Sequence, residues 1–219
     1  MLVNLKSYWY SKPFTFLTIV FVIITANICI WIGSNNLFIS VVNFSHFRFS
    51  NIVFTCISFL GNGYFAVGLS FLYILNNRTT IVGIQLLLAF IVSGLLAQFL
   101  KKIFNLPRPR EFFNNTIYES ILTNAHGGYT SFPSGHTTTA FACAFILCHI
   151  YKGKLVQVGL FIIAVLVGYS RVYLGHHFVE DVLAGAVLGT LSSWLIVKLF
   201  VPNNKVKMYS KGKKYKTIM

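Results

Sequence analysis

Acidic side chains are scarce in this sequence. Its 219 residues include 4 Asp and Glu against 18 Lys and Arg, and charged residues of both signs make up 10% of the chain. A soluble domain carries roughly 25% charged residues. Because the mean hydropathy is also high, at +0.71, the composition excludes an ordinary soluble protein and indicates a membrane protein. A nucleic-acid-binding protein could be equally basic, but it would not consist mostly of apolar runs, so nucleic acid is not an expected partner.

Paired cysteines are also lacking. Cys29, Cys56, Cys143 and Cys148 stand inside apolar runs, and none forms a CxxC pair. They are therefore expected to be small buried hydrophobic residues and not a disulfide or zinc framework. Proline is absent from the apolar runs themselves, since all 5 prolines lie outside them. This distribution favours unbroken helices.

What the sequence does contain is a series of apolar stretches, which predict an all-α, polytopic membrane protein built as a six-transmembrane-helix bundle. A helix that crosses the hydrocarbon needs about 20 residues. The fourth and fifth stretches are shorter, so we expect their helices to extend into the polar motifs beside them. No repeat or linker divides the chain, which predicts one domain. The stretches are Phe14–Gly33, Ile52–Leu75, Thr80–Leu100, Thr137–Tyr151, Leu155–Tyr169 and Val182–Val201.

The distribution of basic residues predicts the orientation. If both termini are cytoplasmic, most of the 18 Lys and Arg residues fall on the cytoplasmic side, as the positive-inside rule favours. The resulting division is a cytoplasmic N-terminus (1–13), a six-span domain (14–201) and a basic cytoplasmic tail (202–219). The tail is expected to be a topology anchor over anionic lipid. The acidic residues then lie on the outer side.

Three polar clusters stand at the outer ends of the predicted spans. "KKIFNLPRPR" leaves the third stretch, "PSGH" enters the fourth, and "SRVYLGHHFVED" connects the fifth to the sixth. The first two clusters share a loop, and the third lies two crossings further on. Because an even number of crossings returns the chain to the same face, the three clusters are able to meet there.

The basic residues of these clusters suit phosphate. Lys101, Arg108 and Arg171 would place three positive charges at the headgroup boundary, where the planar forks of the arginines match phosphate oxygens. Ser134 and the amide of Gly135 stand at a predicted helix N-terminus, which favours anions. Taken singly, Ser134 could be only an N-cap and each arginine an interface anchor. Their occurrence on one side favours a phosphate-binding site.

The histidines of the clusters suit phosphate-ester cleavage without a metal or other cofactor. His177 and Asp181 are spaced i, i+4 and so share a face on a helix. The carboxylate can hold one ring nitrogen protonated and leave the other as a nucleophile. His136 would be a second histidine, able to protonate a leaving oxygen. His176 and Glu180 form a similar pair one residue out of register, although only His177 stands four residues before Asp181.

The order K-x6-RP, PSGH and SR-x5-H-x3-D resembles the signature of the type-2 phosphatidic acid phosphatase superfamily, and every signature position is matched in order and spacing. The resemblance covers about 14–201 and includes the six-span layout. It implies a metal-independent membrane lipid phosphatase with His177 as nucleophile, Asp181 as its partner and His136 as general acid. The residues that it implies for phosphate binding are Lys101, Arg108, Ser134, Gly135 and Arg171.

The substrate stays open at this stage. Similar proteins act on lipid A phosphates, undecaprenyl diphosphate, phosphatidylglycerol phosphate or phosphatidate. The residues around the second and third motifs are more similar to those of enzymes that remove phosphate from lipid A. Undecaprenyl diphosphate is the next alternative substrate. The expected location is a bacterial inner membrane, with the active site at the outer, periplasmic face. A lipid transporter or flippase with an anion-binding mouth is the alternative from another class, and a haloperoxidase, whose relatives are soluble, is disfavoured by the six spans.

Several residues outside the signature have open roles. His46 and His126 are outer-loop histidines that could contact substrate, and His149 is expected to be structural. Asn62 could contact a headgroup or bond a neighbouring helix. The pair of glycines in "GAVLG", which begins at residue 185, should let another helix approach closely.

Overall fold

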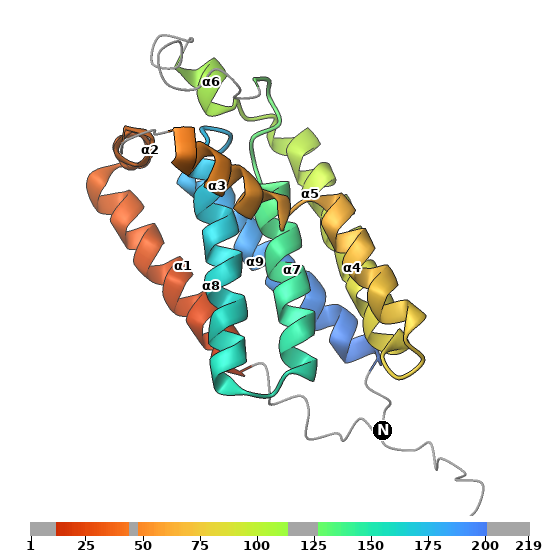
Figure 1. Cartoon of the computed structure of the whole chain (residues 1–219). Coiled ribbons are helices and arrows are strands. Elements are labelled where there is room, and N and C mark those ends of the chain that lie inside the picture. The colour runs from red at the N-terminus through yellow and green to blue at the C-terminus, as the bar shows by residue number, and fades with distance from the viewer. Residues whose placement is uncertain (1–11, 44–47, 114–126, 201–219) are drawn as a thin grey trace, which may run out of the picture.

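The structure is a computed structural model of the chain that describes residues 12–43, 48–113 and 127–200. Every regular element in these ranges is a helix, so the all-α prediction is confirmed for the part that is described (Figure 1). The helices are α1 (Lys12–Ile32), α2 (Ser34–Val42), α3 (Arg48–Phe59), α4 (Gly63–Leu75), α5 (Thr80–Phe104), α6 (Pro109–Phe112), α7 (Gly135–Ile150), α8 (Lys154–Tyr173) and α9 (Val179–Phe200).

Four helical segments are long and apolar enough to cross a membrane, and α3 with α4 forms a fifth if this bent pair counts as one span. The remaining apolar helix, α7, has 16 residues. As expected, α7 and α8 extend into the polar motifs that flank their apolar stretches. The count of six spans stays a prediction. The four long segments are Lys12–Ile32, Thr80–Phe112, Lys154–Tyr173 and Val179–Phe200.

Helix α7 is the centre of the bundle. It packs against α9, α5 and α8, while α1 lies on α8 and α9, and α4 lies along α5 (Figure 1). Its sequence, GHTTTAFACAFILCHI, has small or hydroxylated side chains at many positions, and most of its residues are buried. Small residues let neighbouring helices approach closely, which is how membrane helices gain packing contact. Helix α7, which begins in the PSGH motif, therefore lies in contact with the three other long helices that carry signature residues, α5, α8 and α9.

The two glycines of α9 permit this contact, as the sequence predicted. A Cβ added at Gly185 would lie 2.7 Å from the carbonyl oxygen of Ser134, and one at Gly189 would lie 3.0 Å from the amide nitrogen of Ala142. Any larger side chain would push α9 away from α7. Because the contact includes Ser134, this packing fixes the start of α7 against the start of α9, where the signature residues of both helices stand.

The second predicted span is broken, contrary to the sequence prediction of one helix over 52–75. The chain leaves α3 after Phe59 and starts α4 at Gly63, with a bend of 49°. Asn62 explains the new helix start, because it is the N-cap of α4 and its side chain accepts a hydrogen bond from the amide of Tyr64 at 3.0 Å. This cap contact is neither of the two roles that the sequence suggested for Asn62.

The helix ends that carry the signature gather at one end of the bundle. Helices α5 and α8 end there, α7 and α9 begin there, and the short helices α2 and α6 lie beside them (Figure 1). Helix α5 stops at Asn105, whose φ of 44° is left-handed, and prolines follow at positions 107 and 109. Proline at the first position of a helix has no amide to leave unpaired, so Pro109 starts α6 directly after Arg108.

Large apolar side chains cover the outside of the bundle. Trp31 is 88% exposed and Leu155 is 85% exposed, as expected of a surface that meets lipid and not water. The four cysteines are free, and Cys143 and Cys148 are buried as expected. The expectation of burial is wrong for Cys56, which is exposed on α3, and only partly met for Cys29, which is half-buried. Apolar residues in a membrane protein need not face the core.

Candidate active site

His177 and Asp181 form a buried pair at the junction of α8 and α9. The two residues are 2% and 3% exposed, and Nδ1 of His177 lies 3.2 Å from Oδ2 of Asp181. The chain reaches this position by a turn at Gly175, whose φ of 69° is left-handed and favours glycine. The amide of His177 then donates to the carbonyl of Arg171 at 3.3 Å. With a proton on Nδ1, facing the carboxylate, the lone pair of Nε2 is available.

Ser131 orients the carboxylate, and sequence reasoning did not select it. Its hydroxyl donates to the same Oδ2 of Asp181, and the amide of Phe178 donates to this oxygen at 3.0 Å. Ser131 is 1% exposed. It stands just before the PSGH motif, far from Asp181 in the sequence, and the two residues meet only because α7 packs on α9. No spacing in the sequence could have identified it.

The ammonium of Lys101 holds the segment that leads into α7. Lys101 is 7% exposed in the last turn of α5. Its Nζ donates to the carbonyl of Thr130 and to that of Ser131 at 3.5 Å. Since an ammonium has three donors, one N–H is left for a further acceptor. The predicted phosphate ligand therefore also ties two of the three clusters together.

Ser134 at the start of α7 both caps this helix and connects it to the start of α9. Ser134 is the N-cap, and its Oγ accepts from the hydroxyl of Thr137 at 3.0 Å. Its amide donates to the carbonyl of Asp181 at 2.9 Å, which joins the starts of α7 and α9. A Cβ added at Gly135 would meet no atom within 4 Å, so this part of the helix N-terminus borders open space. His136 follows and is half-buried.

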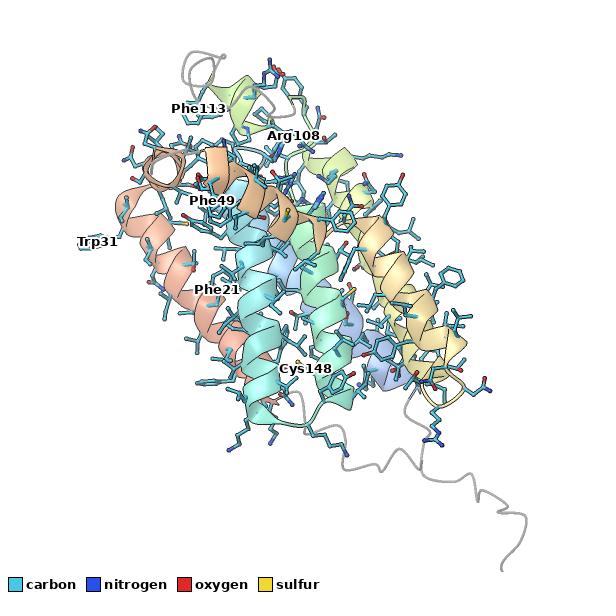
Figure 2. All side chains as sticks on the ribbon, viewed as in Figure 1. Phe21, Trp31, Phe49, Arg108, Phe113 and Cys148 are labelled. Carbon is cyan, nitrogen blue, oxygen red and sulfur yellow. The ribbon has the colours of Figure 1, made fainter. Side chains whose placement is uncertain are left out.

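Three cationic side chains from different elements surround the pair. Arg171 is 7% exposed in the last turn of α8. Arg108 is half-buried just before α6, and Figure 2 shows it at the end of the bundle opposite Cys148. The charges of Lys101, Arg108 and Arg171 all act on His177 and on His136. The structure thus brings the predicted basic residues and both predicted histidines into one electrostatic environment.

The three cations around the site outnumber the carboxylates that act on them. Asp181 is the carboxylate that acts on Lys101 and Arg108. The Nε atoms of Arg108 and Arg171 are buried and have no hydrogen-bond partner among the described residues. A buried donor without a partner is costly. An anion with several acceptor oxygens would satisfy both the donors and the charge, as phosphate does.

The backbone of Arg108 is fixed by a turn that sequence reasoning also missed. The amide of Arg108 donates to the carbonyl of Gly128 at 2.8 Å. The amide of Gly128 in turn donates to Oε1 of Glu111 at 3.2 Å. Gly128 is therefore held on both sides, through its carbonyl by the amide of Arg108 and through its own amide by a carboxylate of α6. The sequence showed Glu111 only as one of the few acidic residues.

The environment of His177 keeps its ring neutral. His177 lies between α8 and α9, outside the spans. Burial lowers its pKa well below the ordinary value of 6.5, and the positive charges of Arg171, Arg108 and Lys101 lower the pKa further. A neutral imidazole is the form that has a lone pair to offer. The arrangement favours the chemical state that a nucleophile needs.

The remaining histidines are His149 at the other end of the bundle, His176 beside His177, and two that lie outside the described residues. These two are His46 and His126. His149 is on the last turn of α7, with its ring 5.5 Å from that of Phe145. His176 is 9% exposed, and its amide donates to the carbonyl of Arg171 at 2.9 Å. Within the described ranges, no three His, Cys, Asp or Glu residues are grouped so that they could hold a metal ion.

Comparison with known proteins agrees with the resemblance seen in the motifs. An undecaprenyl-diphosphatase of Sulfolobus acidocaldarius is 32% identical over 77% of this chain and 79% of its own. A lipid A 1-phosphatase of Rhizobium johnstonii is 34% identical over 54% of this chain, and the match spans 48%, about half, of that relative. The expectation of an enzyme of the phosphatase class is confirmed by these relatives.

The fold is also shared with a solved membrane enzyme. The crystal structure of a transmembrane PAP2-type phosphatidylglycerolphosphate phosphatase from Bacillus subtilis superposes with a TM-score of 0.63 and 30% identity, over 86% of this chain and 95% of that one. The PAP2 superfamily profile matches residues 82–205, which include all three signature clusters. This chain therefore belongs to the PAP2 superfamily.

Proposed function

We propose that this chain is a metal-independent lipid phosphatase that removes a phosphate group from an envelope lipid through a phosphohistidine intermediate. The observation that carries the proposal is the surplus of buried positive charge around a neutral His177. The unpartnered Nε atoms of Arg108 and Arg171 and the open space at Gly135 suit the oxygens of a phosphate. The partners that follow are a phosphorylated lipid and the bilayer.

The proposed reaction has two steps. Nε2 of His177 attacks phosphorus and the bond from phosphorus to the leaving oxygen breaks. His136 gives its proton to that oxygen, and its protonated form is favoured once the negative charge of the bound phosphate offsets the cations around it. Water then attacks phosphorus, His136 takes a proton from this water, and the bond from phosphorus to His177 breaks to release phosphate. Asp181 stabilises the charge that develops on the imidazole. The arginines stabilise charge on the phosphate oxygens, as fixed cations do in phosphoryl transfer.

The lead substrate is a lipid A phosphate. The support for this choice is the sequence around the motifs and the similarity to a named lipid A 1-phosphatase. Undecaprenyl diphosphate is the main alternative, because the named undecaprenyl-diphosphatase matches a larger share of the chain. Phosphatidylglycerol phosphate and phosphatidate follow. All four present a phosphate at the headgroup boundary, and the proposed phosphate site has the same chemistry for each.

Phosphate release by the purified protein tests the function. The protein is incubated in detergent with each of the four lipids, in the presence of EDTA, and inorganic phosphate is measured. We expect release with EDTA present and the highest kcat/KM on lipid A. A different preferred lipid would overturn the substrate assignment alone. No release from any of them would favour the alternative of another class, a lipid transporter or flippase with an anion-binding mouth.

The proposed location is a bacterial inner membrane, with six spans over 14–201, both termini cytoplasmic and the site at the periplasmic face. Labelling of intact cells tests this orientation in a variant whose own cysteines are replaced. Lys102 is exposed beside the site and Lys154 is exposed at the other end of the bundle. An impermeant maleimide should label Lys102→Cys and not Lys154→Cys. Labelling of the second position alone would mean that the orientation is inverted.

A further inference from the structure

The break between α3 and α4 lies against two of the helix ends that form the site. Helix α3 packs along α8, and Ser58 in its last turn is 4% exposed. Nη1 of Arg171 donates to the hydroxyl oxygen of Ser58 at 2.6 Å. Gly61, three residues later, is so close to α7 that an added Cβ would lie 2.6 Å from the carbonyl oxygen of His136. The break therefore contacts both the cation of α8 and the start of α7.

We infer that Ser58 is a positioning residue that fixes which edge of the Arg171 guanidinium faces the phosphate. This inference rests on the proposed function. A guanidinium is a rigid planar fork, so a hydrogen bond to Nη1 also orients the opposite edge, formed by Nε and Nη2. On that edge, Nε is buried without a hydrogen-bond partner among the described residues. Two parallel donors on one edge match two oxygens of a phosphate.

Ser58 is itself held firmly enough to serve this purpose. Its carbonyl accepts from the amide of Gly61 at 3.0 Å, inside the tight turn that bends the chain. An unbroken helix over this segment would lack that turn, and the contact of the break with α7 depends on it. The break thus gives Arg171 a fixed partner from an element that carries no signature residue.

Ser70 provides a matched control. It is also a buried serine, 0% exposed on α4, but its hydroxyl donates to the carbonyl of Ala66 in its own helix at 2.7 Å. Both serines lose one buried hydrogen bond when changed to alanine. Only Ser58 has a partner in the proposed phosphate site, so a general packing effect would appear in both variants and a positioning effect in one.

The test compares Ser58→Ala and Ser70→Ala with the parent protein. The measurements are kcat and KM for phosphate release, the inhibition constant of inorganic phosphate and the thermal unfolding midpoint. Because the lost bond involves a charged group, we expect kcat/KM of Ser58→Ala to fall about tenfold or more, with a matching rise in the phosphate inhibition constant. Ser70→Ala should keep both values within about twofold. Ser58→Thr, which restores the hydroxyl, should recover most of the loss.

A double-mutant cycle with Arg171→Lys makes the test specific. If Ser58 acts through the guanidinium, Ser58→Ala should change kcat/KM by less than about twofold in the Arg171→Lys background. If Ser58→Ala does not fold, Ser58→Cys replaces it, because a thiol keeps the volume and is a weak acceptor, and the same cycle applies. Equal losses in both backgrounds would overturn the inference.

The outcomes separate the inference from the proposed function. A parent protein that releases no phosphate from any lipid contradicts the proposed function itself. A parent protein that is active and sensitive to Arg171→Lys, but whose Ser58→Ala variant behaves like Ser70→Ala, contradicts only the role of Ser58.

Discussion

The two ends of the bundle differ in the exposure of their cationic side chains, because among the described residues only the site end buries any of them. At the site end, Lys101 and Arg171 are each 7% exposed, although each carries a full charge. At the other end, Arg78 and Lys154 are exposed, and the ammonium of Lys198 lies 4.8 Å from the ring centroid of Trp194, as is usual for residues at a membrane interface. Exposed cations are stabilised by water and lipid headgroups, whereas buried ones need a partner. The difference agrees with the proposal that a phosphate binds at the site end.

The largest difference between the two ends is expected when the histidine at each end is replaced. Both His177 and His149 are largely enclosed, but only His177 has a carboxylate at hydrogen-bond distance. We expect His177→Ala to abolish phosphate release from every substrate, because no other group would attack phosphorus. His149→Ala at the other end should keep most of the activity. The measurement is kcat on a lipid phosphate for both variants, with folding checked by thermal unfolding.

The chemical stability of a trapped phosphoenzyme tests independently whether His177 is the nucleophile. A phosphohistidine is labile in acid and stable in alkali, unlike a phosphoserine. Labelled phosphate held by the quenched enzyme should show this pattern in the parent protein and be missing in His177→Ala. Label that survives acid, or that persists in the variant, would mean that another residue is the nucleophile.

The second largest effect is expected for His136, and it should depend on the substrate. If His136 protonates the leaving oxygen, its removal should cost ~10²–10⁴-fold on a lipid phosphate, the usual value of general acid catalysis. It should cost much less on p-nitrophenyl phosphate, whose leaving group needs no proton. The quantity to measure is the ratio of kcat/KM on the two substrates. His177→Ala is the control, because its loss should be complete on both, and an equal loss for His136→Ala on both would exclude the general-acid role.

Charge geometry is the third test, with a smaller effect. Arg108→Lys and Arg171→Lys keep the charge but lose the bidentate fork, so we expect roughly tenfold to hundredfold lower kcat/KM, the value of one or two charged hydrogen bonds. Lys102→Ala, an exposed position beside Lys101, and Lys154→Ala at the other end should each stay within about twofold. Equal losses in all four would mean that the protein senses only total charge, and the contrast between its ends would then have no functional meaning.

Much of this site could be predicted from the sequence, because its residues stand in short motifs at helix ends. The spacing of His177 and Asp181 is local, and the even number of crossings brings the clusters to one end. Ser131 and Ser58 could not be predicted in this way. Each becomes part of the site only through contact between helices, Ser131 through α7 against α9 and Ser58 through α3 against α8. Hydrogen bonds between different helices produce no regular spacing of residues that could be recognised in the sequence.

The fold was predictable in class and less so in detail. Apolar runs predict helices, yet they do not distinguish the helix that faces lipid from the helix that faces the core. Helix α1 has the highest mean hydropathy of the long segments, 2.4, and only 6% of its apolar window is buried, whereas the buried α7 contains three consecutive threonines. The break at Asn62 was also missed, because Gly61 and Asn62 stand inside an otherwise continuous apolar run.

The smallest expected effect is a shift in the pH dependence of activity. His177 must be neutral to attack phosphorus, and its pKa in the free protein lies well below 6.5, through burial first and then through the charges of Arg171, Arg108 and Lys101. The acid limb of kcat/KM, which reports the free enzyme, should therefore lie below pH 6.5. Arg171→Gln removes the charge that lowers the pKa of His177 most among the three, so this pKa should rise and the acid limb should move to higher pH.

Two features make this small shift interpretable. The phosphate substrate titrates as well, but its own ionisation is common to both proteins, so the difference between their profiles reports the protein alone. Lys154→Gln removes the same charge at the other end of the bundle, where salt and lipid headgroups screen it, and should leave the profile unchanged. Because Arg171→Gln also lowers the rate, the profiles are compared after scaling each to its own maximum. An acid limb that stays in place would mean that Arg171 does not lower the pKa of His177, and that this cation acts on the phosphate and not on the nucleophile.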